Sequence, residues 1–250
     1  MNNIPYISGD TDEAAKERLR LFGLSERSAG DNDSFILETD QGRWQIRSLK
    51  DKNFGAVHID FVSGKVAHRR IFGSPRNEAI TRAVGFKKDA IPNILDLTAG
   101  LGQDAFVLAS VGCRIHMIER CNIIAALLYD GLKRAEKDNE IGQWVRKRLS
   151  LSFEDSLNGL KELPFEPDVV YIDAMFPEKK KSALVRKEVQ LLREIVGQDF
   201  DQDELLEVGR NIAKRRIVVK RPNSAEYLNN EKPNISIKSK NYRFDIYLLT

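Results

Sequence analysis

A short apolar run, a turn with two glycines and the start of a helix follow one another at residues 94–105. Gly100 and Gly102 permit tight turning of the backbone and close approach of a ligand. The first turn of the following helix offers backbone N–H groups that have no partner within the helix. Together these features predict a strand, a ligand-binding loop and a helix, the arrangement with which nucleotide-binding α/β domains begin.

Acidic residues flank these glycines and restrict the kind of ligand. Asp96 precedes the glycines and Asp104 follows them. Carboxylates at these positions would repel a pyrophosphate, whereas they attract the ammonium and sulfonium groups of S-adenosylmethionine (SAM). The loop therefore favours SAM as the cofactor. Residues 100–105 also satisfy the relaxed dinucleotide pattern, so an NAD-dependent oxidoreductase remains an alternative.

Strand and helix patterns alternate from residue 93 onward and predict a mostly parallel, doubly wound, Rossmann-like sheet. Strands are expected at 93–97, 114–119, 149–153, 167–172, 216–220 and 242–249, and helices near 103–110, 123–138, 180–195 and 203–214. No clear helix joins the last two strands, so the final strand is expected to return antiparallel beside its predecessor. Such an ending is typical of a SAM-dependent methyltransferase of class I and unlike a dinucleotide-binding dehydrogenase.

The N-terminal third of the chain has a different pattern, which predicts a small α+β cap. The expected elements are a helix at 11–24, β-hairpins within 35–49 and 54–70, and a helix at 76–86 that begins at Ser74-Pro75. We therefore expect a cap formed by residues 1–88 and a methyltransferase domain formed by residues 89–250.

Polar residues follow the second and third predicted strands, where Rossmann-like folds contact a nucleotide. Glu119 ends the second strand 19 residues after Gly100, a spacing typical of an acid that accepts hydrogen bonds from ribose hydroxyls. Asp155 and Ser156 follow the third strand, where such folds commonly contact adenine. Asp155 is equally typical of a turn or a helix N-cap, so both interpretations remain open.

The segment 169–177 predicts the catalytic centre, because a buried strand leads directly into Asp173 at the carboxyl edge of the sheet. The exocyclic amino group of a base is a poor nucleophile, since its lone pair is delocalised into the ring. Asp173 and a neighbouring main-chain carbonyl are suited to accept its two hydrogens and to stabilise the developing positive charge. Phe176 is suited to stack on an extruded base. A strand-end acid and a core phenylalanine are the structural alternative.

Basic residues gather near the predicted strand ends. The net charge of +3 is too small to indicate a nucleic-acid partner, so only local clustering supports that inference. Clusters at strand ends favour phosphate contacts, although a charged run is commonly just a solvated face. The predicted RNA-binding residues are Arg69, Arg70, Lys179, Lys180, Lys220 and Arg221.

Composition sets the remaining limits. Hydrophobic residues make up 42% and charged residues 31%, with no long apolar segment and no visible signal peptide. Cys113 and Cys121 fit neither a CxxC pair nor a metal-ligand set with the three histidines. We therefore expect a cytoplasmic protein with reduced thiols, no membrane association and no metal.

Several strings of this sequence resemble the ribosomal RNA small subunit methyltransferase J family. They are residues 96–113, Glu119-Arg120, 173–177 with 181–185, 218–222 and 243–247, and residues 67–70 in the cap. The resemblance implies a SAM-dependent enzyme that methylates the 2-amino group of one guanine in 16S ribosomal RNA, either free or in the small ribosomal subunit. It implies cofactor contacts by Gln103, Asp104, Glu119, Arg120, Asp155, Ser156 and Asp173.

Two residues depart from the pattern of that family. Ala174 stands where relatives typically have proline, which leaves the backbone less restrained in φ. Gln103 stands where arginine is common, which removes a charge near the cofactor. Asp173 and Phe176 are retained, so we expect direct in-line methyl transfer without a covalent enzyme intermediate. A non-catalytic RNA-binding or ribosome assembly factor remains a further alternative.

Overall fold

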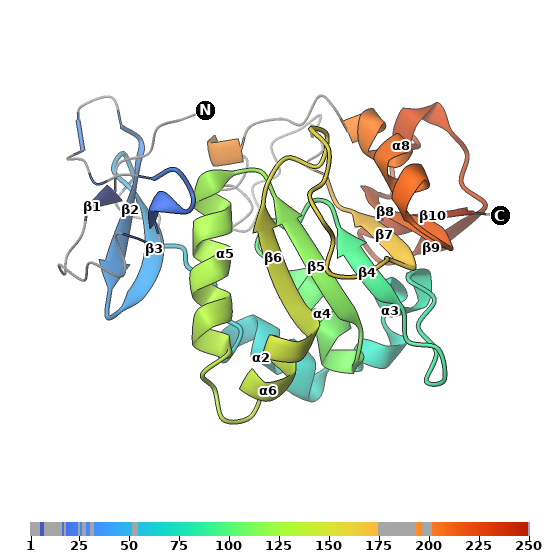
Figure 1. Cartoon of the computed structure of the whole chain (residues 1–250), viewed down its shortest axis with the longest axis horizontal. Coiled ribbons are helices and arrows are strands. Elements are labelled where there is room, and N and C mark those ends of the chain that lie inside the picture. The colour runs from blue at the N-terminus through green and yellow to red at the C-terminus, as the bar shows by residue number, and fades with distance from the viewer. Residues whose placement is uncertain are drawn as a thin grey trace.

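Two β-sheets and a set of surrounding helices form the molecule in the computed structural model (Figure 1). The structure describes residues 6–7, 17, 19–24, 26, 29–30, 33–51, 55–174, 194–196 and 202–249. Among these residues no helix is both long and apolar enough to cross a membrane.

The central sheet has seven strands in the described part of the chain, in the order β6-β5-β4-β7-β8-β10-β9. They are β4 (Asn93–Asp96), β5 (Arg114–Glu119), β6 (Leu149–Phe153), β7 (Val169–Ile172), β8 (Arg216–Pro222), β9 (Ile235–Lys238) and β10 (Tyr242–Leu248). The strands from β6 to β8 are mutually parallel, and β10 is antiparallel to both β8 and β9. The predicted Rossmann-like sheet with an antiparallel last strand is confirmed.

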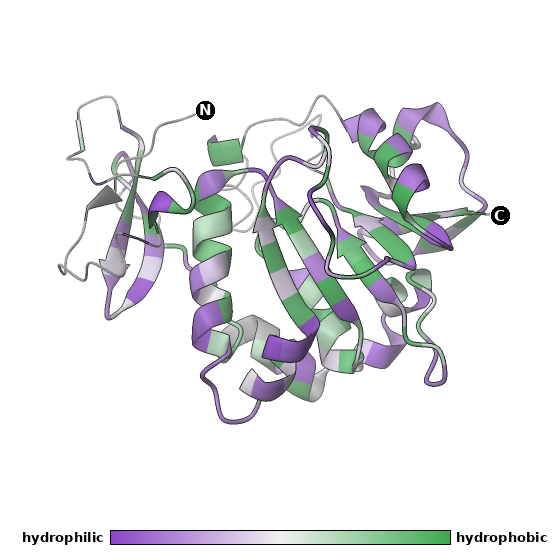
Figure 2. Ribbon diagram, in the orientation of Figure 1, coloured by the Kyte–Doolittle hydropathy of each residue, from purple (hydrophilic) through white to green (hydrophobic). Residues whose placement is uncertain are grey.

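Alternate residues of the central strands face two hydrophobic cores, as the period of two in a strand requires. Ile94 and Val169 pack on the side covered by α4 (Gln103–Val111), α5 (Asn122–Ala135) and α6 (Gly142–Arg148). Leu95 and Val170 pack on the opposite side, against α8 (Gln202–Ile212). Figure 2 shows the hydrophobic residues along the central strands and the mixture of hydrophobic and hydrophilic residues on α8.

The smaller sheet contains β1 (Tyr6–Ile7), β2 (Phe35–Asp40) and β3 (Arg43–Ser48), and it lies beside α5 (Figure 1). The β2–β3 hairpin turns at Gln41 and Gly42, as predicted. The segment that follows the hairpin reaches α5 so closely that a Cβ atom on Gly131 would lie 2.7 Å from Cγ2 of Ile59. This contact fixes the N-terminal sheet against the central one.

The second predicted hairpin is wrong, because residues Gly64–Phe72 form the helix α2. The carboxylate of Asp60 accepts hydrogen bonds from the N–H groups of Val62 and Ser63, and this turn leads into a helix instead of a second strand. Residues 67–70 include no β-branched or aromatic residue and favour a helix on intrinsic propensity. The helix expected at 76–86 is shorter than predicted, since η1 (Pro75–Asn77) precedes α3 (Ala79–Ala83).

Among the described residues, four further elements were not predicted, namely β1, α6, β9 and η2 (Leu228–Asn230). The strand β9 alternates isoleucines with polar residues over only four positions and is mostly exposed, as is typical of a short edge strand, so its pattern was too short to predict a strand. The helices predicted at 11–24 and 180–195 lie largely outside the described residues. The domain boundary at residue 88 stays a prediction.

Candidate functional site

The carboxyl ends of three neighbouring parallel strands carry acids. Asp96 ends β4, Glu119 ends β5 and Asp173 directly follows β7. The strand β4 lies between β5 and β7, so the chain leaves it toward one side of the sheet and later returns on the other. Ligands of open α/β sheets bind outside the carboxyl ends of the strands at such a switch point. The fold thus brings the predicted acids together where a cofactor is expected.

The glycine loop joins β4 to α4 in a conformation that depends on its two glycines. Gly100 has a φ of +53° and Gly102 a φ of +68°, both in the left-handed region. A Cβ atom on Gly102 would lie only 2.7 Å from Cδ1 of Leu128. Glu119 holds the loop from the next strand, because its Oε2 accepts the N–H of Gly100 at 2.8 Å and its Oε1 accepts that of Cys121 at 2.7 Å.

Replacement of Gly102 by alanine is expected to destabilise the fold by about 1–3 kcal/mol, because the new methyl group meets Leu128 and the residue keeps a positive φ. Chemical denaturation measures the loss. Gly159→Ala is the matched control, since Gly159 has a φ of +85° but no atom within 4 Å of its Cβ position. If both variants lose the same stability, crowding by Leu128 does not contribute.

Asp96 and Thr98 connect the loop to the end of β7. The side chain of Asp96 is buried and accepts the N–H of Thr98 at 3.0 Å. Burial raises the pKa of Asp96 to about 8, and the neighbouring acids Asp173, Asp104 and Glu119 add to this shift. The hydroxyl of Thr98 accepts the N–H of Asp173 at 2.6 Å, which fixes the backbone where the catalytic acid is expected.

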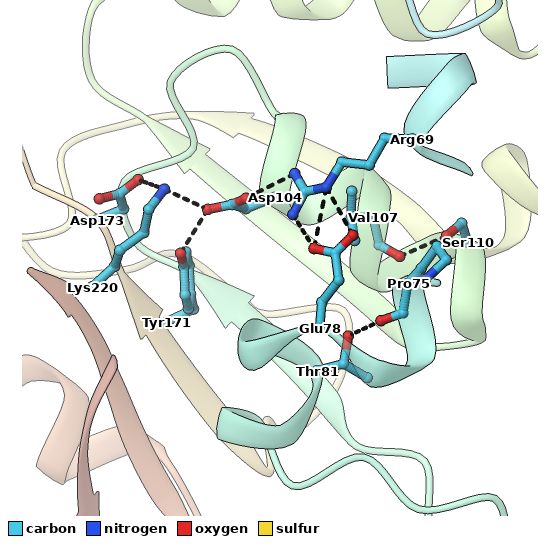
Figure 3. A network of polar contacts seen from close by, with 10 residues as sticks. All are labelled: Arg69, Pro75, Glu78, Thr81, Asp104, Val107, Ser110, Tyr171, Asp173 and Lys220. Carbon is cyan, nitrogen blue, oxygen red and sulfur yellow. Dashed lines mark hydrogen bonds and ion pairs between the residues drawn. The ribbon is translucent and has the colours of Figure 1, made fainter. Parts of the chain in front are cut away.

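Lys220 of β8 lies at the centre of a polar network with two of the acids (Figure 3). Its Nζ donates to Oδ2 of Asp104 and to Oδ2 of Asp173, each at 2.8 Å. The hydroxyl of Tyr171 donates to the same oxygen of Asp104 at 2.8 Å. Arg69 of α2 pairs with Asp104 at 3.5 Å and with Glu78. The network extends from the end of β7 to α2.

The charges of this network shift the pKa values of its members in different directions. Burial disfavours the ionised form of Asp104, but Lys220, Tyr171 and Arg69 outweigh it and lower the pKa of Asp104. Burial and the nearby Asp104 raise the pKa of Asp173, although Lys220 opposes the shift. Lys220 itself loses solvation, yet the two carboxylates raise its pKa and keep it charged. The site therefore holds Asp173 as a relatively basic carboxylate beside a fixed cation.

The other predicted cofactor residues line the same edge with different degrees of exposure. Gln103 is exposed at the start of α4, and Arg120 is partly buried after β5. Asp155 accepts the N–H of Leu157 at 3.1 Å, as a turn residue does, whereas Ser156 is buried and donates to the carbonyl of Leu97 at 3.0 Å. Their contacts with the cofactor stay predictions.

The predicted RNA-binding residues are mostly engaged within the protein. Arg70 pairs with Glu140 at 2.7 Å, and Arg69 and Lys220 belong to the polar network. Arg221 is buried, and its guanidinium donates to the carbonyl of Glu226. Burial and the neighbouring Arg243 lower the pKa of Arg221 to about 10. Phe176, Lys179 and Lys180 lie outside the described residues, so their roles stay predictions.

Three members of the site were not predicted from the sequence, namely Thr98, Tyr171 and Glu78. Tyr171 carried a signal, since it is the only hydroxyl in the otherwise apolar strand β7. A buried tyrosine usually has a hydrogen-bond partner, which here is Asp104. The sequence around Thr98 and Glu78 contains no such signal. The partner of Thr98, Asp173, is distant in the chain, and the partner of Glu78, Arg69, lies in a helix that was predicted as part of a hairpin.

The geometry fits SAM. Glu119, Asp104 and Asp173 place carboxylates near the loop and suit a cationic ligand, whereas Asp96, with a pKa of about 8, is largely protonated at neutral pH. The missing side chains at Gly100 and Gly102 leave the backbone open to close approach. Glu119 lies at the end of the second strand of the unit, where ribose hydroxyls are usually bound. Among the described residues, no group of three or more His, Cys, Asp or Glu side chains is arranged to hold a metal ion.

This strand order, glycine loop and acidic edge define a class I SAM-dependent methyltransferase. Residues 19–249 match a family described as "Putative SAM-dependent methyltransferase". The chain is 46% identical to the ribosomal RNA small subunit methyltransferase J of Tolumonas auensis over the full length of both proteins. It therefore belongs to the ribosomal RNA small subunit methyltransferase J family. The predicted family and cofactor are confirmed, and the NAD-dependent oxidoreductase is set aside.

Two further relatives agree with this assignment. The ribosomal RNA small subunit methyltransferase J of Photobacterium profundum is 48% identical over 98% of this chain and 94% of its own. The crystal structure of a SAM-dependent methyltransferase from Neisseria gonorrhoeae superposes with a TM-score of 0.77 at 32% identity, over 98% of this chain and 95% of that one.

Proposed function

We propose that this protein methylates the 2-amino group of a guanine in 16S ribosomal RNA, in the cytoplasm where ribosomes are assembled. The names of its relatives support ribosomal RNA of the small subunit as the substrate. The observation that carries the choice of an amino group is Asp173, a carboxylate of raised pKa at the end of β7. An acceptor of this kind is required where an amino nitrogen gains positive charge.

Bound SAM supplies an electrophilic methyl group on a sulfonium. Glu119, with Asp96 and Asp104 near the loop, is proposed to hold the cofactor, and Gln103, Arg120, Asp155 and Ser156 to add contacts. The main-chain N–H of Asp173 donates to Thr98 and its carboxylate accepts from Lys220, so backbone and side chain are both held before the guanine arrives. Such preorganisation avoids a reorganisation cost during the reaction.

Asp173 accepts a hydrogen bond from the guanine amino group and stabilises the positive charge that develops on the amino nitrogen. To do so it must be ionised, although its surroundings raise its pKa. Lys220 lies 2.8 Å away and favours the ionised form, and Asp104 balances the charge of Lys220 from the other side. We therefore assign Lys220 to the positioning of Asp173, in competition with the RNA contact predicted for it from sequence. Phe176 is proposed to stack on the target base.

Nucleoside mass spectrometry of 16S ribosomal RNA from a deletion strain tests the proposal. We expect one N2-methylguanosine to disappear and to return when purified enzyme and methyl-labelled SAM are added to the RNA or to small subunits. Catalytically inactive protein is the control for restoration. An unchanged set of modified nucleosides in the deletion strain would reject the proposed substrate, and return of the nucleoside in a deletion strain that expresses the inactive protein would favour an assembly factor.

A further inference from the structure

A hollow lies at the carboxyl end of β8, on the side of that strand where β10 and β9 follow in the sheet. Its volume is about 460 Å³, within the range of about 300–1,000 Å³ typical of small-ligand sites. We call it the Tyr227 hollow, and it is lined by Asn223, Ala225, Glu226, Tyr227, Asn230, Ser236, Lys238 and Arg243. The contributing elements are the end of β8, η2, β9 and the start of β10.

The hollow and Asp173 both lie at the carboxyl end of β8. Lys220, which contacts Asp173, precedes the last residue of β8 by two positions, or roughly 7 Å along the strand. Neighbouring residues of a strand face opposite sides, so Lys220 points toward Asp104 while Arg221 points toward Glu226. The hollow thus opens on the sheet face opposite to Lys220, and an RNA strand with its target base at Asp173 would reach it by crossing the carboxyl end of the sheet.

Tyr227 forms an aromatic platform in the hollow. The residue is 37% exposed, and the guanidinium of Arg243 lies 4.9 Å from the centre of its ring. Arg243 is buried and rigidly held, because it donates to both carboxylate oxygens of Asp245 at 2.9 Å and to the carbonyls of Pro222, Asn223 and Glu226. A cation fixed behind one face of the ring holds Tyr227 in place and leaves the rest of the ring to a ligand.

The groups around the platform suit a nucleotide. Lys238 lines the hollow and is exposed, and Lys232 and Lys240 are exposed on the adjoining segments. The side-chain amide nitrogen of Asn223 donates hydrogen bonds to the carbonyls of Ser239 and Lys240. Proteins that bind single-stranded nucleic acid combine such aromatic platforms for bases with ammonium groups for phosphates. Glu226 is the one acidic residue among those that line the hollow, and its main-chain carbonyl accepts hydrogen bonds from Arg221 and Arg243.

We propose that the Tyr227 hollow binds an unpaired nucleotide of the substrate RNA beside the target guanine, with its base on Tyr227 and a phosphate on Lys238. This inference rests on the proposed function and adds a second point of contact between the protein and its RNA substrate. The hollow would thereby select the sequence or shape of the RNA around the target, while Asp173 acts on the guanine itself.

Steady-state kinetics with labelled SAM and 16S ribosomal RNA tests the inference. We expect Tyr227→Ala to raise KM for RNA about tenfold, with kcat at saturating RNA and the Kd for SAM unchanged. Tyr227→Phe keeps the ring and is expected to retain a near-normal KM. Lys238→Ala is expected to weaken RNA binding and to reduce the salt dependence of binding by about one charge. Lys137→Ala is the matched control, because Lys137 is exposed after α5 at the far edge of the sheet.

The possible outcomes separate the nucleotide site from the proposed function. If Tyr227→Ala and Lys238→Ala keep normal KM and RNA affinity while the wild type methylates ribosomal RNA, the nucleotide site is wrong and the proposed function stands. Losses on assembled subunits with normal binding to naked RNA would assign the hollow to a ribosomal protein and overturn the inference. If the wild type methylates no ribosomal RNA, the proposed function and this inference both fail. Should Tyr227→Ala prove unstable in thermal melts, the surface substitution Lys238→Ala tests the nucleotide site in its place.

Discussion

Asp173→Asn is expected to lower kcat by about 10²- to 10³-fold and to leave the Kd for SAM nearly unchanged. Asparagine has the same shape, and the N–H of residue 173 still reaches Thr98, so the backbone at the end of β7 is preserved. The variant lacks the negative charge that we propose accepts a hydrogen bond from the guanine amino group. Single-turnover methylation of ribosomal RNA measures the chemical step, and isothermal titration measures cofactor binding.

Asp89→Asn is a suitable control for this variant. Asp89 is exposed and precedes β4, at the edge of the sheet opposite the site. It is expected to keep normal turnover. Wild-type turnover in Asp173→Asn would reject Asp173 as the amino-group acceptor, whereas a parallel loss of SAM binding would assign it to the cofactor alone.

Lys220→Met is expected to shift the acidic limb of the pH–rate profile upward by about one to three pH units. In the wild type Lys220 lowers the pKa of Asp173, against burial and the neighbouring Asp104. Without this cation the pKa of Asp173 rises further, so a larger fraction is protonated at neutral pH and inactive. The rate near pH 7 is then expected to fall and to recover as the pH rises. Lys220→Arg keeps the charge and is expected to lose less activity.

The same profile separates this role from the RNA contact predicted for Lys220. A lysine that binds phosphate would raise KM for RNA and lower the salt dependence of binding, without moving the pH limb. Lys214→Met is the matched control, because Lys214 is exposed and pairs with Glu166 near the beginning of β8. An unshifted pH profile in Lys220→Met would show that Lys220 does not position Asp173 or control its ionisation.

The central sheet was predictable because its strands carry their own signals. Segments such as 169–172 are short, apolar and followed by a polar residue, and buried parallel strands require that pattern. The acids Asp96, Glu119 and Asp173 were predictable for the same reason, since the end of a parallel strand fixes the edge at which its next side chain lies. Local sequence was sufficient wherever a single element determined the position of a residue.

Partners from different elements were not predictable. Lys220 and Arg221 are neighbours in the sequence and both looked like phosphate ligands, yet strand alternation sends one to Asp104 and the other to Glu226. The segment 64–72 combined a Ser-Gly turn with a brief alternation of apolar residues, and helix propensity together with packing on α4 decided in favour of α2. Charge pairing and tertiary packing act over distances that no sequence window contains.

The ion pair between Arg69 and Asp104 makes the N-terminal part of the chain a contributor to the active site. Arg69 belongs to α2, whereas Asp104 opens the helix after the glycine loop and shares Lys220 with Asp173. Exchange of the segment that contains α2 between methyltransferases would therefore change the charge around Asp104 and Lys220. A replacement segment would have to keep that arginine or supply its charge from another position.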